Sequence, residues 1–148
     1  MHMKVSDILR IKGSILYTIH PDSLLQVAIH TMSEHDIGSL IVMEYGELIG
    51  VLSFREVLKF ISCQGNVLNT TVRKAMEDHP ITCTLNTEID EIQRMMLDKH
   101  ARYIPVLENK VLMGVISFYD MTKAIIDAKD FENTMLKAYI RDWPTMAS

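Results

Sequence analysis

A seven-residue segment occurs twice in this chain, and the second copy follows the first by 64 positions. The first copy is Gly-Val-Leu-Ser-Phe-Arg-Glu at residues 50–56, and the second is Gly-Val-Ile-Ser-Phe-Tyr-Asp at residues 114–120. The match continues on both sides at the same offset, where it pairs Thr18 with Thr82, Met32 with Met96, Val42 with Val106, Leu48 with Leu112, Lys59 with Lys123 and Ile61 with Ile125. The chain therefore contains a tandem repeat of one supersecondary unit, and we expect the fold to consist of two such units.

Each copy is about 60 residues long, which is marginal for burying a hydrophobic core of its own. Apolar residues make up 48% of the chain, a proportion typical of folded rather than disordered proteins. We therefore expect the two copies to pack on each other and to share apolar surface.

The pattern of apolar and turn-forming residues predicts the same elements in each copy, in the order strand, helix, strand, strand, helix. For copy one it predicts a short helix at 5–9, a strand at 15–19, a helix opened by 21–23 and followed by a turn ending at Gly38, strands at 39–43 and 48–52, and a helix from Ser53 to about Ile61. For copy two it predicts a short helix at 72–76, a strand at 81–84, a helix at 88–99, strands at 103–107 and 111–116, and a helix from Ser117. This alternation indicates an α/β (α+β) fold with helices against small sheets.

Two segments lie outside the predicted repeats, which span 5–61 and 72–127. Residues 62–71 are polar and turn-rich and are predicted to form a linker. The tail, residues 128–148, is predicted to be an added amphipathic helix that stops before Pro144, and its larger apolar residues are Phe131, Leu136, Tyr139, Ile140 and Trp143.

Composition also limits which classes of binding partner and which cellular compartment we expect for this protein. A net charge of −4 and a pI near 5.8 argue against nucleic acid as a partner. No apolar run approaches the ~20 residues of a membrane span, and the start of the chain lacks the apolar core of a signal peptide, so we expect a cytoplasmic protein without a membrane partner. Cys63 and Cys83 lack metal-site spacing and are interpreted as reduced, packed thiols, with no metal site predicted.

The repeated motif has two interpretations. Ser-x-x-Glu at 53–56 and Ser-x-x-Asp at 117–120 stand where a strand becomes a helix, and a capping box alone accounts for the serine and the acid. However, a glycine precedes each serine by three residues inside a strand, which often marks the close approach of a ligand. A helix N-terminus suits a phosphate, and a carboxylate one turn further in can accept hydrogen bonds from a ribose diol.

A second candidate element is Arg102-Tyr103-Ile104-Pro105-Val106. Its proline indicates an edge strand or a strand start, where free backbone groups can meet an adenine edge. Arg102 suits a phosphate, but it equally suits a surface ion pair with Asp98 or Glu108.

These residues resemble a known family. The G-h-h-[ST]-x-x-[DE] ending, the preceding "h-P-V" strand and the tandem layout resemble a pair of CBS domains, the regulatory modules named after cystathionine β-synthase, over about residues 5–127. The resemblance implies two repeats packed about a pseudo-two-fold axis with two clefts between them. It also implies adenosine ligands, with AMP, ADP or ATP ahead of S-adenosylmethionine or NAD, a homodimer in which two pairs form a flat disc, and an effector protein on another chain.

The resemblance also assigns site residues. In the first cleft, Asp120 matches the acid that binds ribose, and Ser117 matches the hydroxyl beside the phosphate. Arg102 and Tyr103 fall where the family contacts phosphate. The adenine wall would be Ile104 and Pro105, and the strand that faces the base would contribute Thr82 and Cys83. The second cleft would hold Ser53, Glu56, Arg55, Thr18, Ser39 and Leu40. Because Glu56 stands where the family usually has Asp, the Asp120 cleft is the first candidate.

An enzyme is not expected, because the histidines show no spacing to Cys, Ser or carboxylates that would form a catalytic set. The sequence thus favours a stand-alone regulatory sensor that binds an adenosine nucleotide. The alternative is a structural homodimerisation module without a ligand, which the aromatic tail would also suit.

Overall fold

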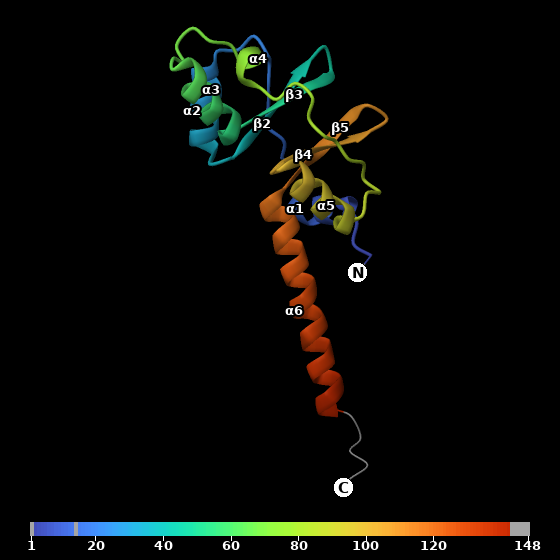
Figure 1. Cartoon of the computed structure of the whole chain (residues 1–148). Coiled ribbons are helices and arrows are strands. Elements are labelled where there is room, and N and C mark those ends of the chain that lie inside the picture. The colour runs from blue at the N-terminus through green and yellow to red at the C-terminus, as the bar shows by residue number, and fades with distance from the viewer. Residues whose placement is uncertain (1, 14, 143–148) are drawn as a thin grey trace.

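The computed structural model describes residues 2–13 and 15–142 of the chain, which form a mixed α/β fold with two small sheets (Figure 1). Copy one contributes α1 (Val5–Lys12), β1 (Thr18–Ile19), α2 (Leu25–His35), β2 (Ser39–Glu44), β3 (Glu47–Ser53) and α3 (Phe54–Gln64). Copy two contributes α4 (Val72–Ala75), α5 (Ile89–Lys99), β4 (Tyr103–Glu108), β5 (Val111–Ser117) and α6 (Phe118–Asp142). The α/β fold and the C-terminal helix predicted from the sequence are confirmed.

The two hairpins repeat each other in register. Ser39 pairs with Ser53 across β2 and β3, and Tyr103 pairs with Ser117 across β4 and β5. The register of each hairpin shifts at the same place in the repeat, after Val42 in the first and after Val106 in the second. Both turn residues of each hairpin have a positive φ, as two-residue type I′ turns require; they are Tyr45, Gly46, Asn109 and Lys110.

The first strand of each copy is shorter than predicted. The strand predicted at 15–19 is reduced to β1, which pairs in parallel with β2. The strand predicted at 81–84 is a single bridge, in which the Cys83 N–H donates to the Pro105 carbonyl at 3.0 Å and the Leu107 N–H donates to the Cys83 carbonyl at 2.9 Å. It stops there because the next residue enters a turn, where the Thr84 N–H donates to the Thr87 hydroxyl at 3.0 Å.

Several predicted helix limits also change. Helix α2 begins at Leu25 because the residues before it bond to α4 instead. After α2 the chain turns at Asp36, whose φ is 52°, rather than at Gly38. Helix α3 continues past Ile61 to Gln64 and ends at Gly65 in the left-handed region.

The predicted tail helix is present, but it continues the helix that follows the second motif instead of forming a separate element. Helix α6 runs without a break through 25 residues, because no glycine or proline interrupts the helical pattern between the second motif and the tail. Trp143 and Pro144 lie outside the described residues. No helix among residues 2–13 and 15–142 is long and apolar enough to cross a membrane.

Each copy receives its first helix from the other copy. Helix α1 packs against α6 and β5 of copy two, where Val5 and Ile8 join the buried cluster around Ile89 and Ile92. Helix α4 packs against α2 and α3 of copy one, where Val72 joins the cluster around Leu25 and Leu52. Matching bridges fix the two helices, Lys4 with Glu88 and Thr71 with Leu24. Because of this exchange, each hydrophobic core contains residues from both copies.

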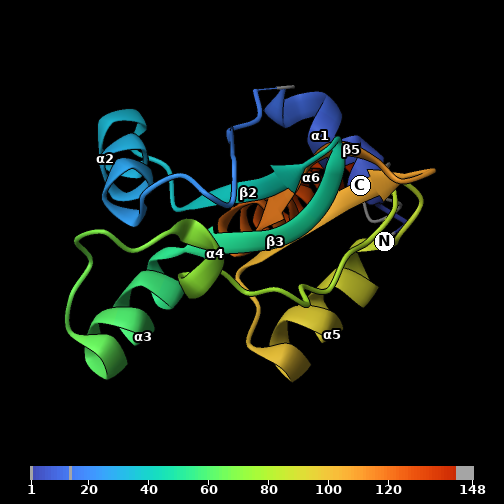
Figure 2. The ribbon, with the colours of Figure 1, turned by 90° about the horizontal axis from the view of Figure 1, so that it is seen from above.

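The exchange leaves the two hairpins side by side between the helices of the two copies, and β3 contacts β5 (Figure 2). Helix α6 packs on α1 and α5 near its start and then extends away from the body (Figure 1). The apolar side chains of its outer part are exposed; they are Ile126, Phe131, Met135, Leu136, Tyr139 and Ile140.

The exchange can be tested on two isoleucines of α1. Ile8 is 5% exposed within the core of copy two, whereas Ile11 is 84% exposed. We expect Ile8→Ala to lower the free energy of unfolding by about 2–4 kcal/mol, because it leaves a cavity in the buried cluster. Ile11→Ala removes the same atoms from the surface and should cost less than ~0.5 kcal/mol. Urea denaturation followed by circular dichroism measures both, and equal losses would contradict the docking of α1 in copy two.

Candidate functional site

Two cavities lie between the copies, and each is lined on one side by residues of one copy of the repeated motif. Cavity I has a volume of about 480 Å³ and contains Ser53, Arg55 and Glu56 of copy one. Its opposite wall comes from copy two, chiefly Ile81, Lys99, His100, Arg102 and Tyr103. Cavity II, of about 720 Å³, contains Ser117, Phe118 and Tyr119 of copy two, and its opposite wall includes Ile15, Tyr17, Gly38 and Ser39 of copy one.

The cavities group the predicted site residues across the copies rather than within one copy. Arg102 and Tyr103, which we assigned to the Asp120 cleft, line both cavities. Ser39, which we assigned to the Glu56 cleft, lies instead with Ser117 in cavity II. Seven predicted site residues line neither cavity: Asp120, Thr82, Cys83, Ile104, Pro105, Thr18 and Leu40. Ile104 and Leu40 are 0% exposed in the two cores.

Both motifs form capping boxes. The Ser53 hydroxyl accepts from the Arg55 N–H at 3.3 Å, and Glu56 Oε1 accepts from the Ser53 N–H at 2.8 Å and from the Ser53 hydroxyl at 2.7 Å. In copy two the Ser117 hydroxyl accepts from the Asp120 N–H, and Asp120 Oδ2 accepts from the Ser117 N–H, both at 3.0 Å. The capping interpretation is confirmed, and each acid is held at the first turn of its helix beside a cavity.

Lys12 is a part of the site that the sequence did not reveal. Its Nζ lies 2.7 Å from Asp120 Oδ2 and donates to the Val115 carbonyl at 2.9 Å, and the Asp120 side chain is only 14% exposed. The cation comes from the end of α1 and therefore from the other copy. A lysine at a helix end carries no motif, so only the exchange of α1 brings it to this acid.

Tyr103 fills the space that Gly38 leaves free. A Cβ atom at residue 38 would overlap the Tyr103 hydroxyl and approach its ring carbon at 2.7 Å. Burial is the main cause that raises the pKa of the Tyr103 hydroxyl, while the charge of Arg102 opposes the rise. Gly38 is the residue of copy one that is equivalent to Arg102 of copy two. Because glycine has no side chain, Tyr103 of copy two can occupy the space between the two cavities.

Arg102 forms no ion pair with Asp98, Glu108 or any other acid among the residues that the structure describes. The predicted alternative, a surface ion pair of Arg102, is therefore not found within residues 2–13 and 15–142. The guanidinium is exposed beside both cavities.

The two cysteines differ in exposure, so the prediction of two packed thiols is wrong for Cys63. Cys83 is buried, and burial, followed by the charge of Glu91, raises the pKa of its thiol to about 12. Its thiol is protonated at neutral pH and shielded from reagents. Cys63 is exposed on α3 and lines cavity I, so it is the thiol that can report on this cavity.

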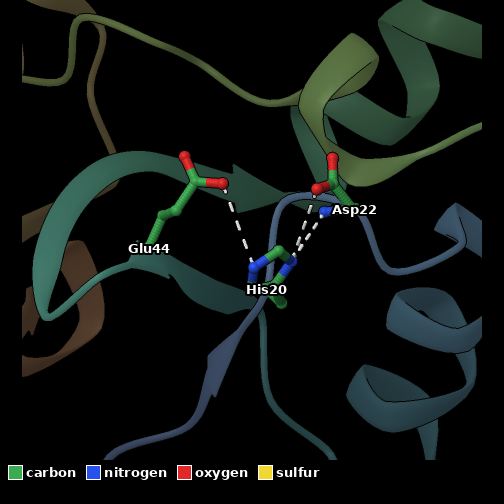
Figure 3. A group of neighbouring side chains, drawn as sticks. All are labelled: His20, Asp22 and Glu44. Carbon is green, nitrogen blue, oxygen red and sulfur yellow. Dashed lines mark hydrogen bonds and ion pairs between the residues drawn. The ribbon is translucent and has the colours of Figure 1, made fainter.

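Three side chains of the types that ligate metals, His20, Asp22 and Glu44, point toward one another outside the two cavities (Figure 3). Both carboxylates are already paired with the guanidinium of Arg73, whose nitrogens lie 3.2 Å from Asp22 and 2.9 Å from Glu44. The hydrogen bonds to Asp22 and Glu44 raise the pKa of Arg73. The arginine supplies the positive charge that the acids need and ties α4 to copy one.

The contact between Gly38 and Tyr103 can be tested with a double-mutant cycle. Gly38→Ala should lower the free energy of unfolding by about 1–3 kcal/mol, because the added methyl group displaces the tyrosine ring. In a Tyr103→Ala background the same change should cost less than ~0.5 kcal/mol, because the overlapping atoms are gone. Chemical denaturation of the four proteins gives the coupling energy. A cost that persists in the Tyr103→Ala background would show that residue 38 is constrained by something other than Tyr103.

Comparison with known proteins agrees with this architecture. The sequence profile of the CBS domain matches residues 5–63 and again residues 72–127. The chain is similar to the CBS domain-containing protein CBSX3 of Arabidopsis thaliana, with 31% identity covering 93% of this chain and 71% of the relative. It is also similar to the CBS domain-containing protein YhcV of Bacillus subtilis, with 25% identity covering 70% of this chain and 74% of the relative.

Among solved structures, the fold is similar to a CBS-domain containing protein from Agrobacterium tumefaciens, with a TM-score of 0.79 and 32% identity. The similarity covers 82% of this chain and 98% of that structure. The repeated motif, the two hairpins in register and the sequence matches lead to one assignment: the chain belongs to the CBS-domain family and contains a tandem pair of CBS domains.

Proposed function

We propose that the chain is a regulatory module that binds an adenosine nucleotide between its two CBS domains and signals to a separate effector protein through the resulting change of packing. The observation that carries the proposal is that each cavity has one wall from each copy. A ligand in either cavity would contact both domains at once. Its binding energy would then favour one relative arrangement of the domains over others.

The chemistry of the cavities supports a nucleotide. Each cavity contains the N-terminus of a helix, α3 or α6, where the positive end of the helix dipole favours a phosphate. The capping boxes already bond N–H groups at both helix starts, so a phosphate would have to replace some of these bonds. Cavity I also has a carboxylate one turn further in, Glu56, which can accept hydrogen bonds from a ribose diol, whereas Asp120 is not among the residues that line cavity II. At Asp120 the diol would have to displace the ammonium group of Lys12. Both volumes fall within the range of ~300–1,000 Å³ that is usual for small-molecule sites.

A thermal-shift experiment tests the nucleotide proposal. AMP, ADP, ATP, S-adenosylmethionine and NAD are each added to protein shown to be free of co-purified nucleotide. A ligand present at ~100 times its dissociation constant should stabilise the protein by about 2.7 kcal/mol, which is a shift of several degrees. Asp120→Asn and Glu56→Gln should each reduce the shift, because a neutral amide is a weaker acceptor for a diol.

The matched control is Asp127→Asn on α6, an exposed acid that pairs with Lys123 outside both cavities. It makes the same chemical change and should leave the ligand shift intact. No shift with any of the five ligands would contradict nucleotide binding and would favour the structural module. A shift that survives both Asp120→Asn and Glu56→Gln would contradict the role of the acids.

Self-association is a second candidate function, and the outer part of α6 favours it. Most helices in proteins are stabilised chiefly by packing an apolar face rather than by intrinsic helix propensity. The face that α6 packs on α1 and α5 continues along its exposed part as Phe131, Met135 and Leu136. We infer that a second copy of the chain covers this face and forms a homodimer.

Sedimentation velocity tests the homodimer. Leu136→Lys places a charge on the apolar face and should weaken self-association by at least about tenfold, because that charge would have to lose its water. Thr134→Lys adds the same charge on the polar side of the same helix and should sediment like the wild type. A wild-type protein that remains monomeric at every concentration would contradict the pairing.

A further inference from the structure

We propose that cavity I selects its ligand by the phosphate chain, so that nucleoside triphosphates and inorganic tripolyphosphate bind there in preference to monophosphates. Cavity II, by contrast, would take a less charged ligand. The inference rests on the proposed function, which it sharpens by assigning a ligand class to one of the two cavities.

Cavity I carries an excess of positive charge. Five basic side chains line it, Arg55, Lys59, Lys74, Lys99 and Arg102, against two carboxylates, Glu56 and Glu77. Among the described residues none of the five forms an ion pair with an acid. The whole chain has a net charge of −4, so composition does not account for this excess.

The cations converge on the cavity from different elements. Two come from α3, one from α4, one from the end of α5 and one from the residue before β4. Arg55 and Lys59 are four residues apart on α3, an arrangement of like charges that disfavours a helix unless a counter-ion is present. Arg55 is also fixed across the cavity, since its Nη1 donates to the His100 carbonyl at 2.8 Å. A solvated face of one helix would not bring charges together from both copies.

The lining of cavity II contains fewer basic side chains. At the repeat positions Arg55 is replaced by Tyr119 and Arg102 by Gly38, and Lys123, the equivalent of Lys59, does not line cavity II. The basic residues that line cavity II are Lys12 and Arg102, and Lys12 already pairs with Asp120. The same backbone architecture therefore presents cations in one cavity and aromatic or apolar side chains in the other.

This difference predicts how ligands are ranked in cavity I. Each additional phosphate adds negative charge within reach of ammonium and guanidinium groups, which bind phosphate through charge-assisted hydrogen bonds. Affinity should therefore rise from adenosine through AMP and ADP to ATP. Because the five cations are exposed, the preference should weaken as salt is added.

Cys63 allows occupancy of cavity I to be measured directly, because it lines this cavity and the other cysteine is buried. The experiment measures the rate at which iodoacetamide, a neutral reagent, alkylates Cys63 in the native protein. Saturating ATP or inorganic tripolyphosphate should slow the reaction by about tenfold, as expected when ~90% of the cavities are filled. Adenosine and AMP at the same concentration should slow it by less than about twofold.

Charge variants complete the test. Lys59→Gln and Lys99→Gln should each weaken protection by tripolyphosphate by about two- to fivefold, the effect of one exposed charge. Lys129→Gln, which removes the charge of an exposed lysine on α6 outside both cavities, should behave like the wild type. Equal protection by adenosine and ATP, or unchanged protection in Lys59→Gln and Lys99→Gln, would overturn the inference.

The inference and the proposed function can fail separately. If nucleotides raise the melting temperature but ATP does not protect Cys63, nucleotide binding stands and the assignment of cavity I is wrong. If tripolyphosphate protects Cys63 as well as ATP does but no nucleotide stabilises the protein more than tripolyphosphate, the polyphosphate site stands and adenosine recognition is wrong.

Discussion

The reciprocal exchange of the first helices is the constraint on which the rest of this structure depends. A unit of about 60 residues is marginal for burying a hydrophobic core of its own. Here neither core is complete within its own copy, because α1 fills the core of copy two and α4 fills the core of copy one. Separating the two domains would therefore open both cores at once, so the domains have to fold and unfold together. A pair linked in this way can shift its packing slightly but cannot come apart.

The two cavities follow from the same exchange. It places the helix start of one copy opposite the loops of the other, so that each cavity is built across the pair. Since the backbone is repeated, the differences between the cavities lie in their side chains. Gly38 and Arg102 illustrate this, because they are equivalent positions of the repeat. The residue has no side chain in copy one and a charged side chain in copy two. Tyr103 uses the empty position to enter the space between the cavities, which couples their walls through one side chain.

Much of the fold could be predicted from the sequence, because local signals are strong here. The hairpin turns, the capping boxes and the order of elements all depend on neighbouring residues. The grouping of site residues could not be predicted, since a repeat offset tells which residues are equivalent and not which are adjacent. Lys12 reaches Asp120 through the exchange of α1 alone. The continuity of α6 was missed for a different reason: the sequence analysis ended the second repeat at residue 127, and the helix does not end there.

The uncovered length of α6 has a mechanical consequence. The helix begins at Phe118 in the wall of cavity II, and its 25 residues span about 37 Å at 1.5 Å per residue. A rotation of about 10° at its base would carry the far end through roughly 6 Å, whereas atoms at the cavity wall would move by a small fraction of that distance. Helix α6 would thus act as a lever, in which a movement on the scale of a side-chain rearrangement at one end becomes a movement of about half a helix diameter at the other.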